Sequence, residues 1–206
     1  MLADLKTTDF INQTAAGTPV PGGGSVSALS AALAAALTEM VANLTAGKKG
    51  YEAVEKEMQE VAAAVKELRQ KLISEIDNDS NAYNDVLAAF KLPKTTEQEN
   101  ERRRQAIQDA MKNAARVPLG VAFDALQVMD LAETVITSGN RNAVTDGAVG
   151  VMLGRTAALG ALYNVKINLA SVKDEAFVEE MMREVNKLQS RVQEREKEIL
   201  SYVKIL

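Results

Sequence analysis

Apolar residues recur at helical spacing along most of this 206-residue chain, and this pattern constrains the fold more than any other feature. Spacing of i, i+3 and i+4 is typical of amphipathic helices, whereas the period-two alternation of strands is scarce. Between Glu52 and Ile76 one face collects Val54, Met58, Val61, Val65, Leu68, Leu72 and Ile76. A second such face collects Val178, Met181, Val185, Leu188, Val192, Ile199 and Val203. We therefore predict an all-α, multi-helix bundle of long and short helices.

The segment Gly17–Gly24 interrupts this pattern, because it contains two prolines and ends in three consecutive glycines. Proline and glycine oppose helix, so we predict a loop here. Ser25 is then expected to cap an alanine-rich helix that ends near Ala46.

Further helix boundaries are predicted in the second half of the chain. Thr96 and Glu99 have the spacing of a capping box, and Asp174 is placed to cap the last helix. Pro118 is expected to kink or interrupt its helix. No linker is long enough to divide the chain, so residues 1–206 are expected to form one helical domain.

Small residues dominate two segments, Ser25–Ala46 and Ala143–Ala161. Small side chains allow helix axes to approach closely, so these segments are expected to form the central helix pair. The surplus of small-residue and amphipathic faces for a chain of this size also predicts a homodimer.

Charge and targeting signals restrict the partners. The formal net charge is −4 and the pI is near 5.1, which argues against a nucleic-acid partner. The start of the chain lacks the basic and apolar regions of a signal peptide. The longest apolar run, Ala28–Leu37, is too short to span a bilayer, so we expect no membrane partner and a cytoplasmic protein.

The chain contains no histidine and no cysteine. This absence excludes disulfides, thiolate nucleophiles, imidazole or thiolate zinc sites and Ser-His-Asp triads. Proton transfer must therefore fall to Asp, Glu, Lys or Tyr.

The stretch Pro21, Gly22, Gly23, Gly24 and Ser25 leads directly into a predicted helix. Its backbone N–H groups and the helix dipole could bind an anion or a ring carbonyl. It is neither a Walker loop nor a dinucleotide fingerprint. A tight connection between helices is the alternative interpretation.

Polar residues also interrupt a helical pattern at Asp77–Asn81. The stretch begins like a calcium loop, but Ala82 and Ala88 stand where that loop needs glycine and glutamate. Local inconsistencies of this kind concentrate at functional sites, so Asp77 and Asp79 are the best candidates for a general acid or base. A solvated helix junction is the alternative.

Three asparagines, Asn140, Asn164 and Asn168, have the pattern of buried amides. A buried amide must find hydrogen-bond partners, and interhelical bonds or a ligand would serve equally. We interpret the basic runs Lys48–Lys49 and Arg102–Arg104 as side chains exposed to solvent. An anionic ligand tail would favour the first of them as a binding pair.

Six blocks, in this order and spacing, resemble the formiminotetrahydrofolate cyclodeaminase / methenyltetrahydrofolate cyclohydrolase family, over about residues 10–177. They are Pro19–Ser27, Asp77-x-Asp79, Leu92-Pro-Lys94, Val117-Pro118, Gly139-Asn140 and Asn164–Leu169. The resemblance implies an all-helical, dimeric enzyme that acts on a one-carbon unit carried by tetrahydrofolate. It further implies that Asp79 is the catalytic acid and that the proline–glycine loop lines the folate pocket.

The resemblance favours cyclodeaminase, which converts 5-formimino-tetrahydrofolate to 5,10-methenyl-tetrahydrofolate and ammonia, with methenyltetrahydrofolate cyclohydrolase close behind. A non-catalytic helical interaction module is the competing class. We expect no metal and no tightly bound cofactor, the tetrahydrofolate derivative being the substrate. In this hypothesis Asp77 and Asn140 orient the reacting groups, the Gly22–Ser25 amides bind the pterin or an anionic part of folate, and Lys48 or Lys49 binds the glutamate tail.

Overall fold

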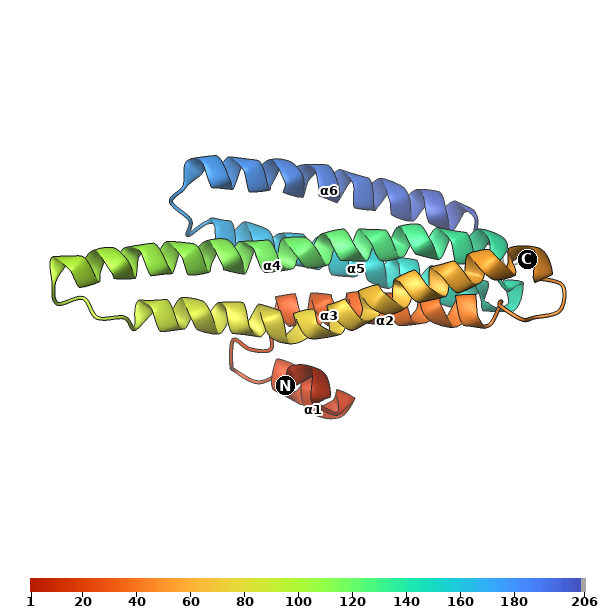
Figure 1. The fold of residues 1–206 in the computed structure, drawn as a ribbon, viewed down its shortest axis with the longest axis horizontal. Coiled ribbons are helices and arrows are strands. Elements are labelled where there is room, and N and C mark those ends of the chain that lie inside the picture. Colours follow the sequence, from red (N-terminus) through yellow and green to blue (C-terminus); the bar gives the residue numbers. More distant parts are fainter. Residues whose placement is uncertain (205–206) are drawn as a thin grey trace.

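The computed structural model describes residues 1–204, and every regular element in that part of the chain is helical (Figure 1). The prediction of an all-α bundle is confirmed. The elements are η1 (Leu2–Asp4), α1 (Thr7–Thr14), α2 (Gly23–Asn43), η2 (Glu52–Val54), α3 (Glu55–Phe90), α4 (Glu97–Ser138), η3 (Arg141–Ala143), α5 (Val144–Leu169) and α6 (Glu175–Ser201).

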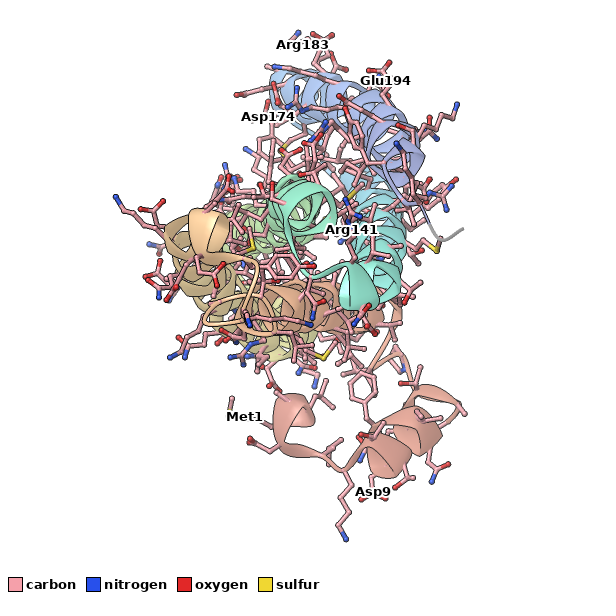
Figure 2. All side chains as sticks on the ribbon, turned by 90° about the vertical axis from the view of Figure 1, so that its right-hand side faces the viewer. Met1, Asp9, Arg141, Asp174, Arg183 and Glu194 are labelled. Carbon is pink, nitrogen blue, oxygen red and sulfur yellow. The ribbon has the colours of Figure 1, made fainter. Side chains whose placement is uncertain are left out.

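Two long helices, α3 and α4, form an antiparallel hairpin that extends beyond the other helices at one end of the bundle (Figure 1). Helices α2 and α5 pack against this hairpin and against each other. Helix α6 covers α5 and α4, while α1 and η1 lie on the opposite side, below α3 (Figures 1 and 2). The loop between α1 and α2 reaches the middle of the bundle, and this placement positions the site described below.

The helical faces read from the sequence form the core. On α3 the residues Met58, Val61, Val65, Leu68, Leu72 and Ile76 are buried, and on α6 Met181, Val185, Leu188, Val192 and Ile199 are buried. The small-residue helices α2 and α5 meet closely, as predicted. A Cβ added at Gly160 would lie 2.5 Å from Ser27 Oγ, and one at Gly150 would lie 3.3 Å from the Ala34 carbonyl oxygen. Glycine is required where backbones approach this closely.

Two predicted caps are confirmed and a third is wrong. Thr96 and Glu99 form a reciprocal capping box, and the Asp174 side chain accepts from the Phe177 N–H. Ser25 does not cap α2, since that helix begins at Gly23 with Gly22 as its N-cap residue. Its hydroxyl is directed to α3 instead, so two of the glycines expected in the loop belong to the first turn of α2.

The interruption expected at Pro118 and the helix junction considered as the alternative at Asp77–Asn81 are both absent from helices that the structure describes in full. Helix α4 runs from Glu97 to Ser138 with Pro118 inside it, and α3 passes through Asp77–Asn81 without a junction. A proline lacks the N–H that would bond the carbonyl four residues earlier, which here belongs to Ala114. The Asn168 amide donates to that carbonyl oxygen at 2.6 Å, so tertiary packing replaces the missing helical bond.

Two stretches, Gly23–Asn43 and Arg141–Leu169, are long and apolar enough to cross a membrane by length and composition alone, with mean hydropathies of 1.5 and 1.2. We expected no such stretch, because we considered only the uninterrupted apolar run. About half of each segment is buried within the bundle, and core helices pass the same test.

Candidate functional site

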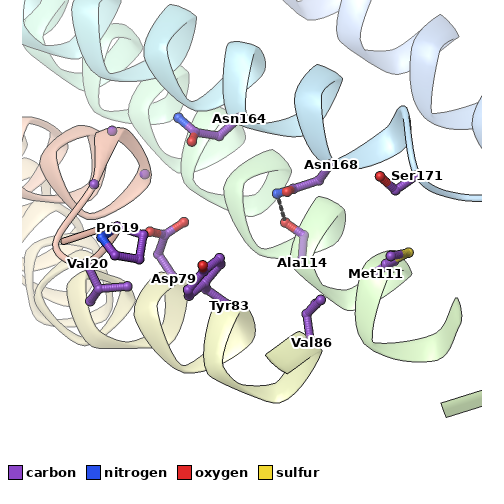
Figure 3. Close-up of a pocket in the computed structure, with 13 residues that line it drawn as sticks. Pro19, Val20, Asp79, Tyr83, Val86, Met111, Ala114, Asn164, Asn168 and Ser171 are labelled. Atoms are coloured by element: carbon purple, nitrogen blue, oxygen red, sulfur yellow. Dashed lines mark hydrogen bonds between the residues drawn. The ribbon is translucent and has the colours of Figure 1, made fainter. Parts of the chain in front are cut away.

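A cavity of about 250 Å³ opens where the first turn of α2 meets α3, α4 and the last turns of α5 (Figure 3). We call it the site cavity. It is lined by Pro19, Val20, Gly22, Gly23, Gly24, Asp79, Tyr83, Val86, Met111, Ala114, Asn164, Asn168 and Ser171. Asp79 is the only charged residue in this lining and Tyr83 is the other side chain there that can exchange a proton, so Asp79 is the strongest candidate for acid–base chemistry in the cavity.

The Asp79 carboxyl lies directly against the start of α2. A Cβ added at Gly24 would stand 1.9 Å from Asp79 Oδ1, so only glycine leaves room for the carboxyl in this position. The Ser25 hydroxyl donates to Asp79 Oδ2 at 3.3 Å and lies 3.1 Å from the Ser80 hydroxyl. The sequence therefore places a glycine and a serine at successive positions to admit and orient one carboxyl group.

Burial raises the pKa of the Asp79 carboxyl above its ordinary value, because the charged form loses solvation in the cavity. The hydroxyl and the backbone N–H of Ser25 act in the opposite direction by stabilising the carboxylate. A carboxyl group whose pKa is raised toward neutrality can both accept and return a proton during turnover.

The glycine loop forms one wall of the cavity. The first N–H groups of a helix have no partner inside the helix, and in α2 these belong to Gly23, Gly24 and Ser25. A Cβ at Gly22 would lie 3.0 Å from the Pro19 carbonyl oxygen, and one at Gly23 would lie 3.4 Å from Asn164 Nδ2. Pro21 and Ser25 are buried behind this wall and do not line the cavity.

Two amides line the opposite wall. Asn164 donates to the Gly160 carbonyl oxygen at 2.9 Å, and Asn168 donates to the Ala114 carbonyl oxygen at 2.6 Å (Figure 3). Each amide has one Nδ2 hydrogen and its carbonyl oxygen left for other partners. Because the first bond fixes each side chain, the cavity presents pre-oriented donors and acceptors suited to a planar, polar heterocycle.

Asp77 is not brought to the site cavity. Its carboxylate accepts from the Leu2 N–H at 2.6 Å and from the Ala3 N–H at 3.3 Å, and so attaches η1 to α3. Two residues along a helix are about 200° apart, so Asp77 and Asp79 face different neighbours.

Asn140, Lys48 and Lys49 also lie away from the site cavity. The backbone N–H of Asn140 donates to Thr45 Oγ1 at 2.8 Å, and its amide donates to the Leu44 carbonyl oxygen at 3.3 Å. Lys48 and Lys49 follow the last turn of α2, Asn140 follows α4 and contacts that turn, and a helix of 21 residues is about 30 Å long. Figure 2 views this end of the bundle, where Arg141 is labelled. The structure therefore separates these three predicted site residues from the glycine loop.

Five cavity residues were missed in the sequence: Tyr83, Val86, Met111, Ala114 and Ser171. Tyr83 and Val86 had a signal, because they lie four and seven residues after Asp79 and so share its helix face. Met111 and Ala114 on α4 and Ser171 after α5 reach the cavity through tertiary packing, which a single helical pattern does not reveal.

Comparison with known proteins gives concordant results. Residues 6–187 match the sequence profile of the family described as formiminotransferase-cyclodeaminase. A methenyltetrahydrofolate cyclohydrolase from Methylorubrum extorquens is 39% identical over 179 residues, which are 87% of this chain and 86% of that protein. A formimidoyltransferase-cyclodeaminase from Rattus norvegicus is 33% identical over 187 residues, which are 91% of this chain but only 35% of that protein.

The fold agrees with a solved relative. The crystal structure of a formiminotetrahydrofolate cyclodeaminase from Thermotoga maritima superposes with a TM-score of 0.87 and 32% identity, covering 98% of both chains. The sequence profile covers most of the chain, and the relatives match nearly all of it. The resemblance carried by the six sequence blocks is thus confirmed, and the chain belongs to the formiminotransferase-cyclodeaminase family.

Proposed function

We propose that this chain interconverts one-carbon units held between N5 and N10 of tetrahydrofolate, with Asp79 as the group that moves the proton. The observation that carries the proposal is the Asp79 carboxyl, with its raised pKa, against the first-turn N–H groups of α2 in a cavity lined by amides. The proposed chemistry uses no tightly bound cofactor, because the folate itself is the substrate.

Hydrolysis of the 5,10-methenyl bridge is the first candidate reaction. It is supported by the 39% identity to a cyclohydrolase that the chain matches nearly end to end. The Asp79 carboxylate takes a proton from water as the oxygen attacks the methenyl carbon. Protonated Asp79 then delivers that proton to N5 as the C–N5 bond breaks. Loss of the hydroxyl proton to solvent completes the 10-formyl product and balances the reaction.

The α2 N–H groups and the two amides have the binding role in this proposal. Asn164 and Asn168 each have an unused donor and an unused acceptor for the polar edge of a pterin ring. Tyr83 supplies an aromatic surface four residues from the proton-transfer group on the same helix. A rigid, pre-oriented lining of this kind holds the methenyl carbon near Asp79.

Cyclodeamination of 5-formimino-tetrahydrofolate is the second candidate reaction. It is supported by the Thermotoga maritima relative, whose full length this chain matches. Here N10 attacks the carbon of the protonated formimino group, Asp79 accepts the N10 proton and returns it to the resulting amine, and ammonia leaves as the methenyl cation forms. The same carboxyl group serves both reactions, since each needs one proton moved between two nitrogen or oxygen atoms.

The test is to follow the methenyl absorption band with purified protein and each substrate separately. A cyclohydrolase makes the band of 5,10-methenyl-tetrahydrofolate disappear faster than in buffer. A cyclodeaminase makes the band appear from 5-formimino-tetrahydrofolate with release of ammonia. If neither rate exceeds that of heat-inactivated protein, the proposed function is wrong, and a non-catalytic helical module becomes the better account.

We also propose that the chain forms a homodimer through the outer faces of α2 and α5. These central helices leave large apolar side chains exposed at helical spacing. The exposed residues are Val26, Leu33 and Met40 on α2, with Val149, Met152, Tyr163 and Ile167 on α5. Apolar side chains exposed at helical spacing on two neighbouring helices support a protein–protein interface there.

Light scattering at micromolar concentration tests the dimer. We expect twice the chain mass for the wild type and the monomer mass for Leu33→Glu, because a charge buried in an apolar interface is costly. Ile73→Glu is the matched control, since Ile73 is an exposed apolar residue on α3. A monomeric wild-type protein would contradict the proposal.

A further inference from the structure

A second cavity, of about 440 Å³, adjoins the site cavity toward the free end of the α3–α4 hairpin. Met111 and Ser171 line both cavities, so the two share a boundary. Figure 3 shows these two residues at the end of the site cavity away from Pro19 and Asp79. A ligand that has its reacting group near Asp79 can therefore continue past Met111 and Ser171.

The size of the site cavity indicates that a folate would continue in this way. At about 250 Å³, the site cavity is smaller than the roughly 300–1,000 Å³ of pockets that enclose a complete ligand of this class. A folate consists of a pterin, a p-aminobenzoyl spacer and a glutamate with carboxylates at its far end. The pterin fills the smaller cavity, and the anionic tail must then lie outside it.

The lining of the second cavity has the charge that such a tail requires. It contains three basic side chains, Arg103, Arg104 and Lys173, and one acidic side chain, Glu101. Within residues 1–204 neither Arg103 nor Lys173 has a carboxylate oxygen within 4 Å, whereas Arg104 pairs with Glu101. The cavity thus combines unpaired cations with a lining that it shares in part with the proton-transfer site.

Hydrogen bonds hold the Arg103 side chain and the backbone of Lys173 in place beside the second cavity. Arg103 donates through Nη2 to the Phe90 carbonyl oxygen at 3.1 Å, and its guanidinium lies 5.6 Å from the centre of the Phe90 ring. The Lys173 backbone N–H donates to Gln108 Oε1 at 2.8 Å, and the same Gln108 amide contacts the Ser171 carbonyl oxygen at 3.4 Å. The loop between α5 and α6 is thereby attached to α4 beside the cavity.

We propose that this second cavity binds the glutamate carboxylates of the folate substrate, with Lys173 as an unpaired cation and with Arg104 exchanging its exposed ion pair with Glu101 for a carboxylate of the tail, while Arg103 stays on Phe90. The proposal depends on the proposed function and names the part of the substrate recognised there. It replaces the earlier assignment of the tail to Lys48 and Lys49, which lie beyond the other end of α2, about 30 Å from the glycine loop.

The experiment compares two double variants with two substrates. Lys173→Gln/Arg104→Gln removes two charges from the second cavity, and Lys48→Gln/Lys49→Gln removes two charges from the other end of the bundle. The substrates are 5,10-methenyl-tetrahydrofolate and the matching tetrahydropteroate, which lacks the glutamate. Melting temperatures of all three proteins show that each variant is folded.

For the glutamylated substrate, we expect the Lys173/Arg104 variant to raise KM by about tenfold with kcat nearly unchanged, because charge-assisted contacts to the non-reacting tail are lost. The KM of the tail-free substrate should stay at the wild-type value, as should both KM values of the Lys48/Lys49 variant. The wild-type KM for the glutamylated substrate should also rise with salt more steeply than that of the Lys173/Arg104 variant.

Distinct results would overturn the tail proposal and the proposed function. If the wild type turns over the folate and the Lys173/Arg104 variant keeps the wild-type KM, the tail proposal is wrong and the proposed function stands. An equal rise in KM for both substrates would show a general disturbance of the site and would also overturn it. If the wild type turns over neither substrate, both proposals fail together.

Discussion

The two ends of α2 carry two buried polar clusters, and they are built in opposite ways. At its last turn, the Thr45 hydroxyl accepts from the Asn140 N–H at 2.8 Å and donates to the Val41 carbonyl oxygen at 2.7 Å. All groups there are neutral and closely paired. At the first turn, the ionisable Asp79 carboxyl accepts a longer bond of 3.3 Å from the Ser25 hydroxyl, is also stabilised by the Ser25 backbone N–H, and faces a cavity.

The difference separates a structural cluster from a functional one. A neutral, fully paired network fixes the register of neighbouring helices and contributes to stability. A desolvated carboxyl with few partners costs stability, and such groups concentrate at reactive sites. Substitutions at the two ends should therefore have opposite consequences: activity is lost at the first turn of α2, and stability is lost at the last.

The largest effect is expected from Asp79→Asn. Removing the proton-transfer group should lower kcat by about 10²–10⁴-fold. Burial raises the pKa of Asp79 in the folded chain, so the ionised carboxyl opposes folding once the pH exceeds the pKa of the unfolded chain. At pH 7 the variant should therefore melt at or above the wild-type temperature. If Asp79→Asn instead lowered the melting temperature and kept kcat above half of the wild-type value, Asp79 would be a structural residue and not the proton-transfer group.

The next effect is expected from Gly24→Ala, which acts on the same carboxyl from α2. Its Cβ would meet Asp79 Oδ1 at 1.9 Å, so the carboxyl must rotate away from its position. A displacement of this size should lower kcat by about 10–100-fold, while alanine favours the helix by about 0.5–1 kcal/mol. Gly17→Ala is the control, since nothing lies within 4 Å of the added carbon. Equal kinetics for the two variants would remove Gly24 from the site.

A third effect, on stability, is expected from Thr45→Val. The substitution keeps the shape of the side chain but leaves the buried Asn140 N–H without its acceptor, at a cost of about 1–3 kcal/mol in unfolding free energy. Denaturant unfolding measures this loss, and kcat should not change. Thr137→Val is the matched control, because its hydroxyl bonds only carbonyl oxygens of its own helix, such as that of Glu133 at 2.9 Å. A loss of activity in Thr45→Val would show that the two ends of α2 are coupled.

The smallest effect is expected from Asp77→Ala. The variant loses the carboxylate that accepts from the Leu2 and Ala3 N–H groups, a partly exposed contact worth about 1 kcal/mol. Steady-state kinetics should match the wild type, because Asp77 does not line the site cavity. A tenfold or larger loss of kcat would restore the orienting role that the sequence suggested.

Local patterns predicted the fold well. The apolar face of α3 and the capping box at Thr96 are decided by neighbours along the chain, so they are visible in sequence. Pro118 was misjudged because its consequence depends on Asn168, which lies 50 residues away and donates to the carbonyl that proline leaves free. Ser25 was misjudged for the same reason, since its hydroxyl is bonded across the bundle to Asp79.

The candidate site was predicted in part. The glycine loop, Asp79 and the amides of Asn164 and Asn168 meet in one cavity. Lys48 and Asn140 were grouped with them although a helix of 21 residues separates the two ends, and that length was already visible in the sequence. Tyr83 shares a helix face with Asp79 and could have been found from that spacing, whereas Met111 could be found only once the packing of α3 against α4 was known.

The central claim is that the Asp79 carboxyl carries the proton, and a pH profile of kcat/KM for wild type and Asp79→Asn tests it most directly. The reaction needs the carboxylate first, so kcat/KM of the wild type should fall on the acid side with a midpoint above about 3.9, the ordinary pKa of aspartate. This acid limb should be absent from the residual activity of Asp79→Asn. An identical limb in both proteins would contradict the account, because another group would then carry the proton.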